Sequence, residues 1–407
     1  MHVHTKKICR RLFASSIMAA ILFLGCQGVA DAHVKWFQPY DLTAPPAPPG
    51  RYMLDPIWLL GLGLSLPALW LCITADTLAD RFFKAPAAVL RAVDFSADRL
   101  IRLSLGLWLS WLWLLPTPIW LTPELTTADT RLQWVQLVLA AFCLSSRTAW
   151  VAGLGIAGLW LGATRQYGIY HLLDYPLFLG FAALLIAGSL HGTRLGRQGV
   201  AGWLVANRHG LLVVSMACTL MWAAVEKWAF AAWSLPLLCS RPWLTMGMAP
   251  EVFLPLSGWL EFGAAAMLML GGTASSRMSA ALLFPIFVSA VLEFGRVDLV
   301  GHFPIIVTLL VTACHGNGRI AETVNLRHLP PLERAIWLPP IYGLALIITN
   351  IAYIGGWQSS YGAPGTVQGM DEYHLARLLM MALIVAGLML AAIGAARLLG
   401  TRQHRSF

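Results

Sequence analysis

Ionisable side chains inside otherwise apolar stretches are the residues of this sequence that could perform chemistry. A charged group inside a membrane is costly, so such residues mark a candidate functional site. They fall between about residues 210 and 314, and the candidate catalytic residues are Glu226, Lys227, Glu261, Glu293, Asp298 and His302. At about 1.5 Å per helical residue, the three glutamates and His302 come to lie in the outer half of the membrane. Carboxylates and an imidazole at one depth could transfer protons, hold a polar ligand or bind a metal.

Helical geometry predicts partners for these groups. Successive helix positions are about 100° apart, so Glu226 and Lys227 cannot face the same point. We therefore expect Lys227 to pair with a carboxylate of another helix, either Glu261 or Glu293. The alternative is that all these groups form buried ion pairs that fix helix packing without any catalysis.

The segment from Glu293 to His302 contains two further spacings that could bring side chains together. Asp298 precedes His302 by four residues, and Glu293 precedes Arg296 by three. Each spacing brings its two side chains together if the helix continues there. An aspartate beside a histidine fixes the tautomer of the ring and raises its basicity, which suits a metal ligand or a proton acceptor.

Three histidines are candidate metal ligands, namely His33, His302 and His374. His33 becomes the first residue if a leader is removed after Ala32, and its free amine and imidazole would then chelate copper together. His374 follows Met370 by four residues, and imidazole and thioether are ligands that suit copper.

The elements that must position these residues are membrane helices. Hydrophobic residues make up 58% of the chain and charged residues 12%, about half the charge of a soluble protein. Apolar stretches long enough for a core of roughly 30 Å predict an all-α, polytopic protein with about eleven transmembrane helices in a lipid bilayer. The expected spans are 53–75, 100–121, 131–146, 148–164, 175–191, 210–233, 252–271, 278–294, 300–314, 335–355 and 374–396.

Basic residues predict the orientation of these spans. Arginine and lysine gather in alternate loops, which by the positive-inside rule face the cytoplasm. The sequence therefore predicts a bacterial inner-membrane protein with a periplasmic mature N-terminus and a cytoplasmic C-terminus. The amphipathic stretch from Asp76 to Arg99 is expected to lie on the cytoplasmic interface. The net charge of +9 then indicates membrane anchoring, with no nucleic-acid partner.

The first 32 residues have the basic region, apolar region and Ala30-Asp31-Ala32 cleavage site of a secretory signal. A lipoprotein signal ending before Cys26 is the competing interpretation. Residues 33–52 form a proline-rich arm that would fold back over the outer face of the protein. Three membrane segments follow. They are the N-terminal membrane helices of residues 53–200, a four-helix module at residues 201–316, and residues 317–407, which contain two helices and a cytoplasmic tail.

The module resembles the DoxX-like family of four-helix membrane proteins over about residues 208–316. The resemblance rests on Glu226-Lys227-Trp228 near the end of a first helix, and on Leu256-Ser257-Gly258 with Glu261-Phe262-Gly263 at the start of a second. Family members include a subunit of a thiosulfate:quinone oxidoreductase. The resemblance implies that Glu226 and Lys227 are a shared polar pair. The helices before and after the module, and the segment from Glu293 to His302, have no counterpart in the family.

Three functions are compatible with these patterns. The first is a component of a quinone-linked membrane redox process, with quinone as cofactor and a membrane or periplasmic redox partner. The second is a copper-handling or copper-transport protein that uses His33, His302 and His374. The third is a structural or assembly factor of a membrane complex. The seven cysteines include no CxxC pair, which disfavours a dithiol oxidoreductase, and no nucleotide-binding motif is present.

Overall fold

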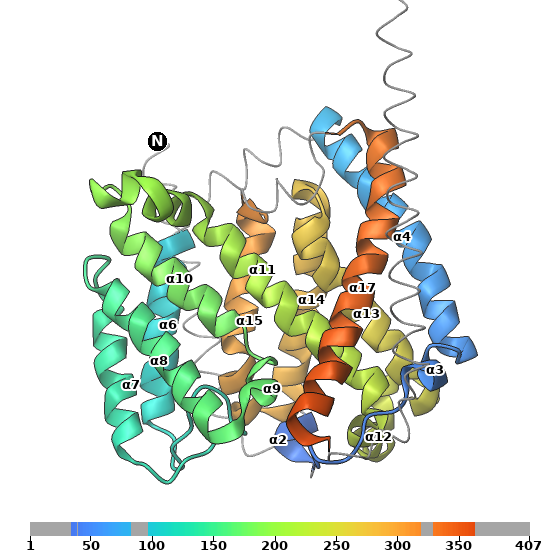
Figure 1. Ribbon diagram of the computed structural model, residues 1–407, viewed down its shortest axis with the longest axis horizontal. Helices are drawn as coiled ribbons and strands as arrows, with labels where there is room; N and C mark the ends of the chain where they lie inside the picture. The colour runs from blue at the N-terminus through green and yellow to red at the C-terminus, as the bar shows by residue number, and fades with distance from the viewer. Residues whose placement is uncertain (1–33, 39, 83–96, 319–328, 363–407) are drawn as a thin grey trace, which may run out of the picture.

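The computed structural model describes residues 34–38, 40–82, 97–318 and 329–362, which form a bundle of α-helices (Figure 1). No strand occurs among these residues, where a single isolated β-bridge joins Ile119 to Thr126. Six of their helices are long and apolar enough to cross a membrane by length and composition. These six are α4 (Pro56–Phe82), α11 (Gly199–Ala229), α13 (Pro250–Leu270), α14 (Thr273–Phe294), α15 (Arg296–His315) and α17 (Pro331–Tyr361). The predicted class, a helical membrane protein, agrees with this architecture.

The other expected spans correspond to shorter helices or lie outside the described residues. The shorter helices are α6 (Ala97–Trp113), α7 (Arg131–Phe142), α8 (Ala149–Tyr167) and α10 (Leu177–Leu190). The 12 residues of α7 rise about 18 Å and the 14 of α10 about 21 Å, less than a hydrocarbon core of roughly 30 Å. The span expected at 374–396 lies outside the described residues. The structure therefore supports a multi-pass helical protein but not the count of eleven spans.

Several expected boundaries were wrong for identifiable reasons. The helix expected at 100–121 ends at Trp113, because Pro116 and Pro118 follow and proline cannot continue a helix. The helix expected at 210–233 begins earlier, at Gly199, and ends at Ala229. There the chain turns at Phe230 (φ −128°, ψ 46°) into the short α12 (Ala231–Ser240).

Short elements gather at one end of the bundle. In Figure 1, α2 (Val34–Phe37), α9 (Ile169–Leu172) and α12 lie along the lower edge, while α11 crosses the middle obliquely. The other short elements are α3 (Pro49–Tyr52) and two 3₁₀ turns, η2 (Pro242–Thr245) and η1 (Leu195–Arg197), of which η1 lies apart from this end, between α10 and α11. The N-terminal arm packs against the bundle at this end. Its Ala47 N–H donates to the Ala229 carbonyl (2.7 Å), and Trp357 donates to the Leu42 carbonyl (2.8 Å).

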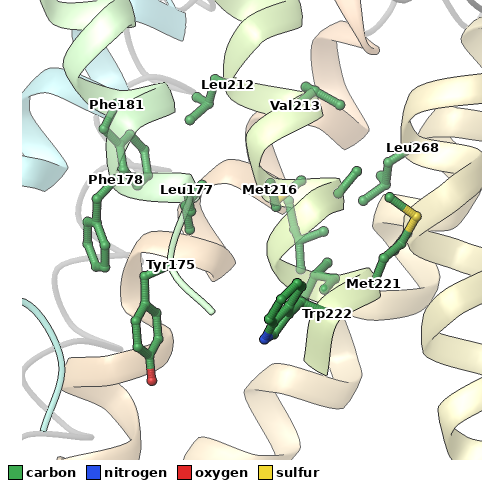
Figure 2. Close-up of a cluster of buried hydrophobic side chains, with 14 of the residues drawn as sticks. Tyr175, Leu177, Phe178, Phe181, Leu212, Val213, Met216, Met221, Trp222 and Leu268 are labelled. Atoms are coloured by element: carbon green, nitrogen blue, oxygen red, sulfur yellow. The ribbon is translucent and has the colours of Figure 1, made fainter. Parts of the chain in front are cut away.

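The packing of α10 against α11 forms the middle of the core. Leu177, Phe178 and Phe181 of α10 and Leu212, Val213 and Met216 of α11 are all buried (Figure 2). Gly180 permits this close approach, because a Cβ there would lie 3.1 Å from the Leu212 Cα and closer still to Ser215. Small residues at such crossings are typical of helices packed inside membranes, where van der Waals contact drives association.

Asp76 corrects the expectation that the stretch from residue 76 lies on the membrane interface. α4 continues to Phe82, and the Asp76 carboxylate is buried at the start of α14. It accepts hydrogen bonds from the backbone N–H groups of Gly272, Ala274 and Ser275 (2.9 Å each) and from the Ser275 hydroxyl (2.6 Å). Asp76 therefore satisfies donors that the first turn of α14 leaves without helical partners. Residues 83–96 of the expected interfacial stretch lie outside the described residues.

A second carboxylate joins α6 to α11 near the same end. Arg208, expected in a loop, is part of α11 and donates to Asp98 (2.9 Å), as does His209 (2.9 Å). Burial raises the pKa of Asp98, but the hydrogen bonds and charges of these two basic groups outweigh burial. They hold the pKa of Asp98 well below its usual range.

Candidate functional site

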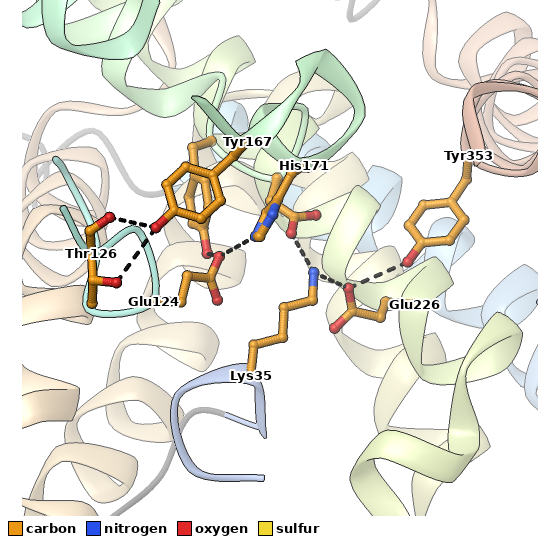
Figure 3. A network of polar contacts seen from close by, with 9 residues as sticks. Lys35, Glu124, Thr126, Tyr167, His171, Glu226 and Tyr353 are labelled. Atoms are coloured by element: carbon orange, nitrogen blue, oxygen red, sulfur yellow. Dashed lines mark hydrogen bonds and ion pairs between the residues drawn. The ribbon is translucent and has the colours of Figure 1, made fainter. Parts of the chain in front are cut away.

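The N-terminal arm contributes a buried lysine to the centre of the candidate site. Lys35 of α2 donates to the Asp174 carboxylate, and its Nζ lies 2.5 Å from Oε2 of Glu226 (Figure 3). The Lys35 side chain is 3% exposed, and those of Asp174 and Glu226 are 11% and 10% exposed. Tyr353 of α17 donates to the same Glu226 oxygen (3.3 Å). Segments far apart in the sequence thus meet around one ammonium group.

A second branch of the network lies next to Asp174 and contains a histidine. His171 Nε2 is 2.9 Å from Oε1 of Glu124, and Tyr175 donates its hydroxyl proton to the same oxygen. The side chains of His171 and Glu124 are 1% and 2% exposed. The rings of Tyr40 and Tyr167 pack edge-on against the imidazole. The loop before α7, the turn of α9 and the residues between α9 and α10 together form this branch (Figure 3).

Burial and charge act in opposite directions on the two central groups. Burial lowers the pKa of Lys35, but the combined effect of the carboxylates of Asp174, Glu226 and Glu124 is larger and raises it. The pKa of Lys35 therefore stands well above its usual value. Burial raises the pKa of Asp174 to about 7, although the charge of Lys35 acts to lower it. Lys35 is therefore charged at neutral pH, and Asp174 takes up a proton more readily than an exposed carboxylate does.

A cavity of about 190 Å³ lies beside this network. Its polar lining comprises Lys35, Thr122, Asp174, Tyr175, Thr219, Glu226, Lys227, Glu261 and His302. Its apolar lining comprises Trp36, Leu177, Phe178, Leu220, Ala223, Ile286, Phe287, Ala290, Gly301 and Ile305. The volume is below the roughly 300–1,000 Å³ of pockets for drug-sized ligands, so the cavity suits a small ligand or a single ring.

Four of the six candidate catalytic residues line this cavity: Glu226, Lys227, Glu261 and His302. Lys227 donates to Oε2 of Glu261 (2.7 Å), which is one of the two partners expected for it. His302 is held from several sides. Its Nδ1 lies 2.8 Å from Oδ2 of Asp298, the contact that their spacing predicted.

Aromatic side chains fix the position of the His302 ring. The rings of Trp36 and Phe287 have their centroids 5.0 and 4.8 Å from that of His302. Trp36 also covers Gly301, where any Cβ would overlap the indole. The arm therefore closes one wall of the cavity with Trp36 and supplies its buried cation with Lys35.

Glu293 departs from the expected arrangement. It accepts a hydrogen bond from Arg241, the residue after α12, in place of the expected contact with Arg296. The i,i+3 contact fails because α14 ends at Phe294 and Gly295 adopts φ 77°, so no helix continues through the segment. Neither Glu293 nor Asp298 lines the cavity, although Asp298 positions His302.

Sequence reasoning noted His171 with Asp174, before the span expected at 175–191, as an external feature that could contribute, but it assigned neither these two residues nor Lys35 or Glu124 to the site. These residues lie in the arm and in loops, where no apolar span surrounds them and so no cost of burial could be recognised. Two of the three predicted metal ligands, His33 and His374, lie outside the described residues. The copper arrangement therefore stays a prediction. Comparison with protein-family models, curated proteins and solved structures finds no match to this chain.

Proposed function

We propose that this chain is a DoxX-like inner-membrane protein whose cavity binds the head group of a quinone, as a component of a quinone-linked redox process. The observation that carries the proposal is the lining of the cavity, where carboxylates, ammonium groups and an imidazole face a largely apolar wall. A quinone ring needs two kinds of surface, an apolar one for its faces and hydrogen-bond donors for its carbonyl oxygens. Lys227 and His302 are donors of this kind.

The proposed chemistry consists of binding and proton transfer. Reduction of a quinone to a quinol takes two electrons and two protons. In this proposal the electrons come from a separate reduced protein or small-molecule donor. The protons pass through the carboxylates of the cavity, with Asp174 suited to proton exchange near neutral pH.

The same proposal assigns the cavity to the periplasmic side. Asp76 and Arg334 lie at the opposite end of the bundle, where Arg334 donates to Thr77 (3.4 Å). Arg277, in the first turns of α14, lies at that end, and basic residues favour the cytoplasm. Phe287 and Ala290 line the cavity near the other end of α14. In this orientation the mature N-terminus is periplasmic and the C-terminus cytoplasmic. The proposal keeps about eleven spans, an odd number that is consistent with termini on opposite sides.

Binding of a short-chain quinone to the purified full chain tests the proposal directly. Ala223→Phe should abolish binding measured by titration calorimetry, because the new ring fills the cavity that Ala223 lines. Ala206→Phe is the matched control, since Ala206 lies on the same helix, is exposed and does not line the cavity. Equal binding by wild type and Ala223→Phe would overturn the proposal.

A second test measures the reaction in membranes supplied with an electron donor. Glu226→Gln and Glu261→Gln should each abolish quinone reduction, because each removes a carboxylate from the cavity. Glu293→Gln changes a carboxylate outside the cavity and should leave reduction in place. If the first two variants reduce quinone as wild type does, the ion pairs act only as helix locks, as a structural or assembly factor would require.

A further inference from the structure

The branch around His171 contains a constellation of ligand atoms that lies mostly outside the quinone cavity. One ligand atom each from Glu124, His171 and Asp174 lies within 4.8 Å of the others. Of the three residues only Asp174 lines the cavity. The side chains of Glu124 and His171 are almost completely buried, at 2% and 1% exposed, so this is not a cluster of solvated surface acids.

Carboxylates gather in this branch. Those of Glu124, Asp174 and Glu226 all act on the ammonium group of Lys35. A buried carboxylate is costly unless it is paired or coordinates a metal, so this environment is compatible with a bound cation.

A buried ring nitrogen points to the same conclusion independently. Nδ1 of His171 is buried and makes no hydrogen bond within the part of the chain that the structure describes. A buried polar atom without a hydrogen bond is costly, and native proteins rarely retain one without a reason. The ring is therefore held only through Nε2, at Glu124, and one of its two nitrogens can serve as the metal ligand.

We propose that Glu124, His171 and Asp174 form a binding site for a divalent transition-metal cation. One imidazole nitrogen and carboxylate oxygens are ligands of Zn²⁺ and similar ions, whereas the absence of sulfur ligands in this set disfavours Cu(I). Metal–ligand bonds of about 2.0–2.2 Å fit ligand atoms separated by up to the observed 4.8 Å after small side-chain movements. Lys35 competes for this site, because its ammonium already contacts Asp174.

Zinc binding to the full chain in detergent tests the proposal, with metal counted by mass spectrometry after equilibrium dialysis. His171→Gln and Glu124→Gln should each remove one bound Zn²⁺ per chain or weaken it at least about a hundredfold. Loss of an outer-shell group alone costs about 10–100-fold, which sets the lower bound for a direct ligand. His302→Gln is the matched control, because it removes a buried imidazole bound to a carboxylate outside the constellation.

Lys35→Met makes the test independent of misfolding. Removal of the competing ammonium should tighten Zn²⁺ binding at least about tenfold, a gain that an unfolded variant cannot produce. Zinc retention by His171→Gln equal to wild type would overturn the proposal. So would equal losses in His171→Gln and His302→Gln, or weaker binding in Lys35→Met.

Discussion

Removal of the Asp76 carboxylate should destabilise the protein far more than removal of an ordinary helix cap. Asp76 lies near the end of α4 and accepts four hydrogen bonds from the first turn of α14. Asp55 offers a matched control at the other end of the same helix. It is exposed, and its carboxylate accepts from the N–H groups of Ile57 (2.8 Å) and Trp58 (3.3 Å).

The number and burial of the hydrogen bonds set the magnitude. A hydrogen bond to a charged group contributes about 1.5–3 kcal/mol, so four of them give an upper bound of roughly 6–12 kcal/mol for Asp76→Ala. Water that enters the vacated space recovers part of this, and such contributions are not additive. We expect a loss of at least about 3 kcal/mol, compared with about 1 kcal/mol for Asp55→Ala. Asp76→Asn should be intermediate, because one oxygen remains for the donors of Ala274 and Ser275.

Unfolding of the purified full chain in mixed detergent and denaturant measures these differences. The expected order of stability is wild type, Asp55→Ala, Asp76→Asn and then Asp76→Ala. Because α14 supplies Phe287 and Ala290 to the cavity, Asp76→Ala should also weaken quinone binding at temperatures where the chain stays folded. A loss in Asp76→Ala no larger than that in Asp55→Ala would refute the assignment of Asp76 as the buried cap of α14.

Three other perturbations have defined outcomes. Since the pKa of Asp98 is held below its unfolded value of about 3.9, its contribution to stability is present above that pH and lost as the pH falls below it. Asp98→Asn should flatten the loss of stability below about pH 4, and an unchanged acid profile would contradict this. Gly301→Ala should displace Trp36 and speed tryptic cleavage in the arm, whereas unchanged cleavage would place the indole elsewhere. Lys227→Met should lower the free energy of unfolding by about 1–3 kcal/mol, because it leaves the Glu261 carboxylate without its partner. The double variant Lys227→Met, Glu261→Gln should regain part of this loss. A further loss in the double variant would show that the two groups are not paired.

The helical class and two polar contacts could be predicted because they depend on local or repetitive signals. Long apolar runs identify membrane helices without knowledge of their neighbours. The contact of Asp298 with His302 follows from positions four apart on one helix. The pairing of Lys227 with Glu261 was predictable only as one of two choices, because the sequence does not show which helix packs beside α11.

The rest of the site depends on long-range packing that has no local signal. Lys35 and Asp174 are 139 residues apart, and both lie in segments too polar to be recognised as buried. Glu293 was assigned the wrong partner because a single glycine, Gly295, ends the helix before Arg296. Some helices were also predicted too long, because α7 and α10 are shorter than the apolar stretches that contain them.

The structure separates two kinds of buried charge that the sequence could only group together. Lys227 with Glu261, and Arg241 with Glu293, are one-to-one pairs of opposite charge, which is sufficient to fix the packing of two helices. Lys35 instead contacts two carboxylates and lies within the field of a third. Such a cluster offers more acceptors than a helix lock needs, because every additional buried carboxylate costs free energy. Protons, a quinone head group or a metal ion would each give the cluster a function, so experiments on ligands belong at Lys35 and the cavity residues, and an experiment on packing alone belongs at the Arg241–Glu293 pair.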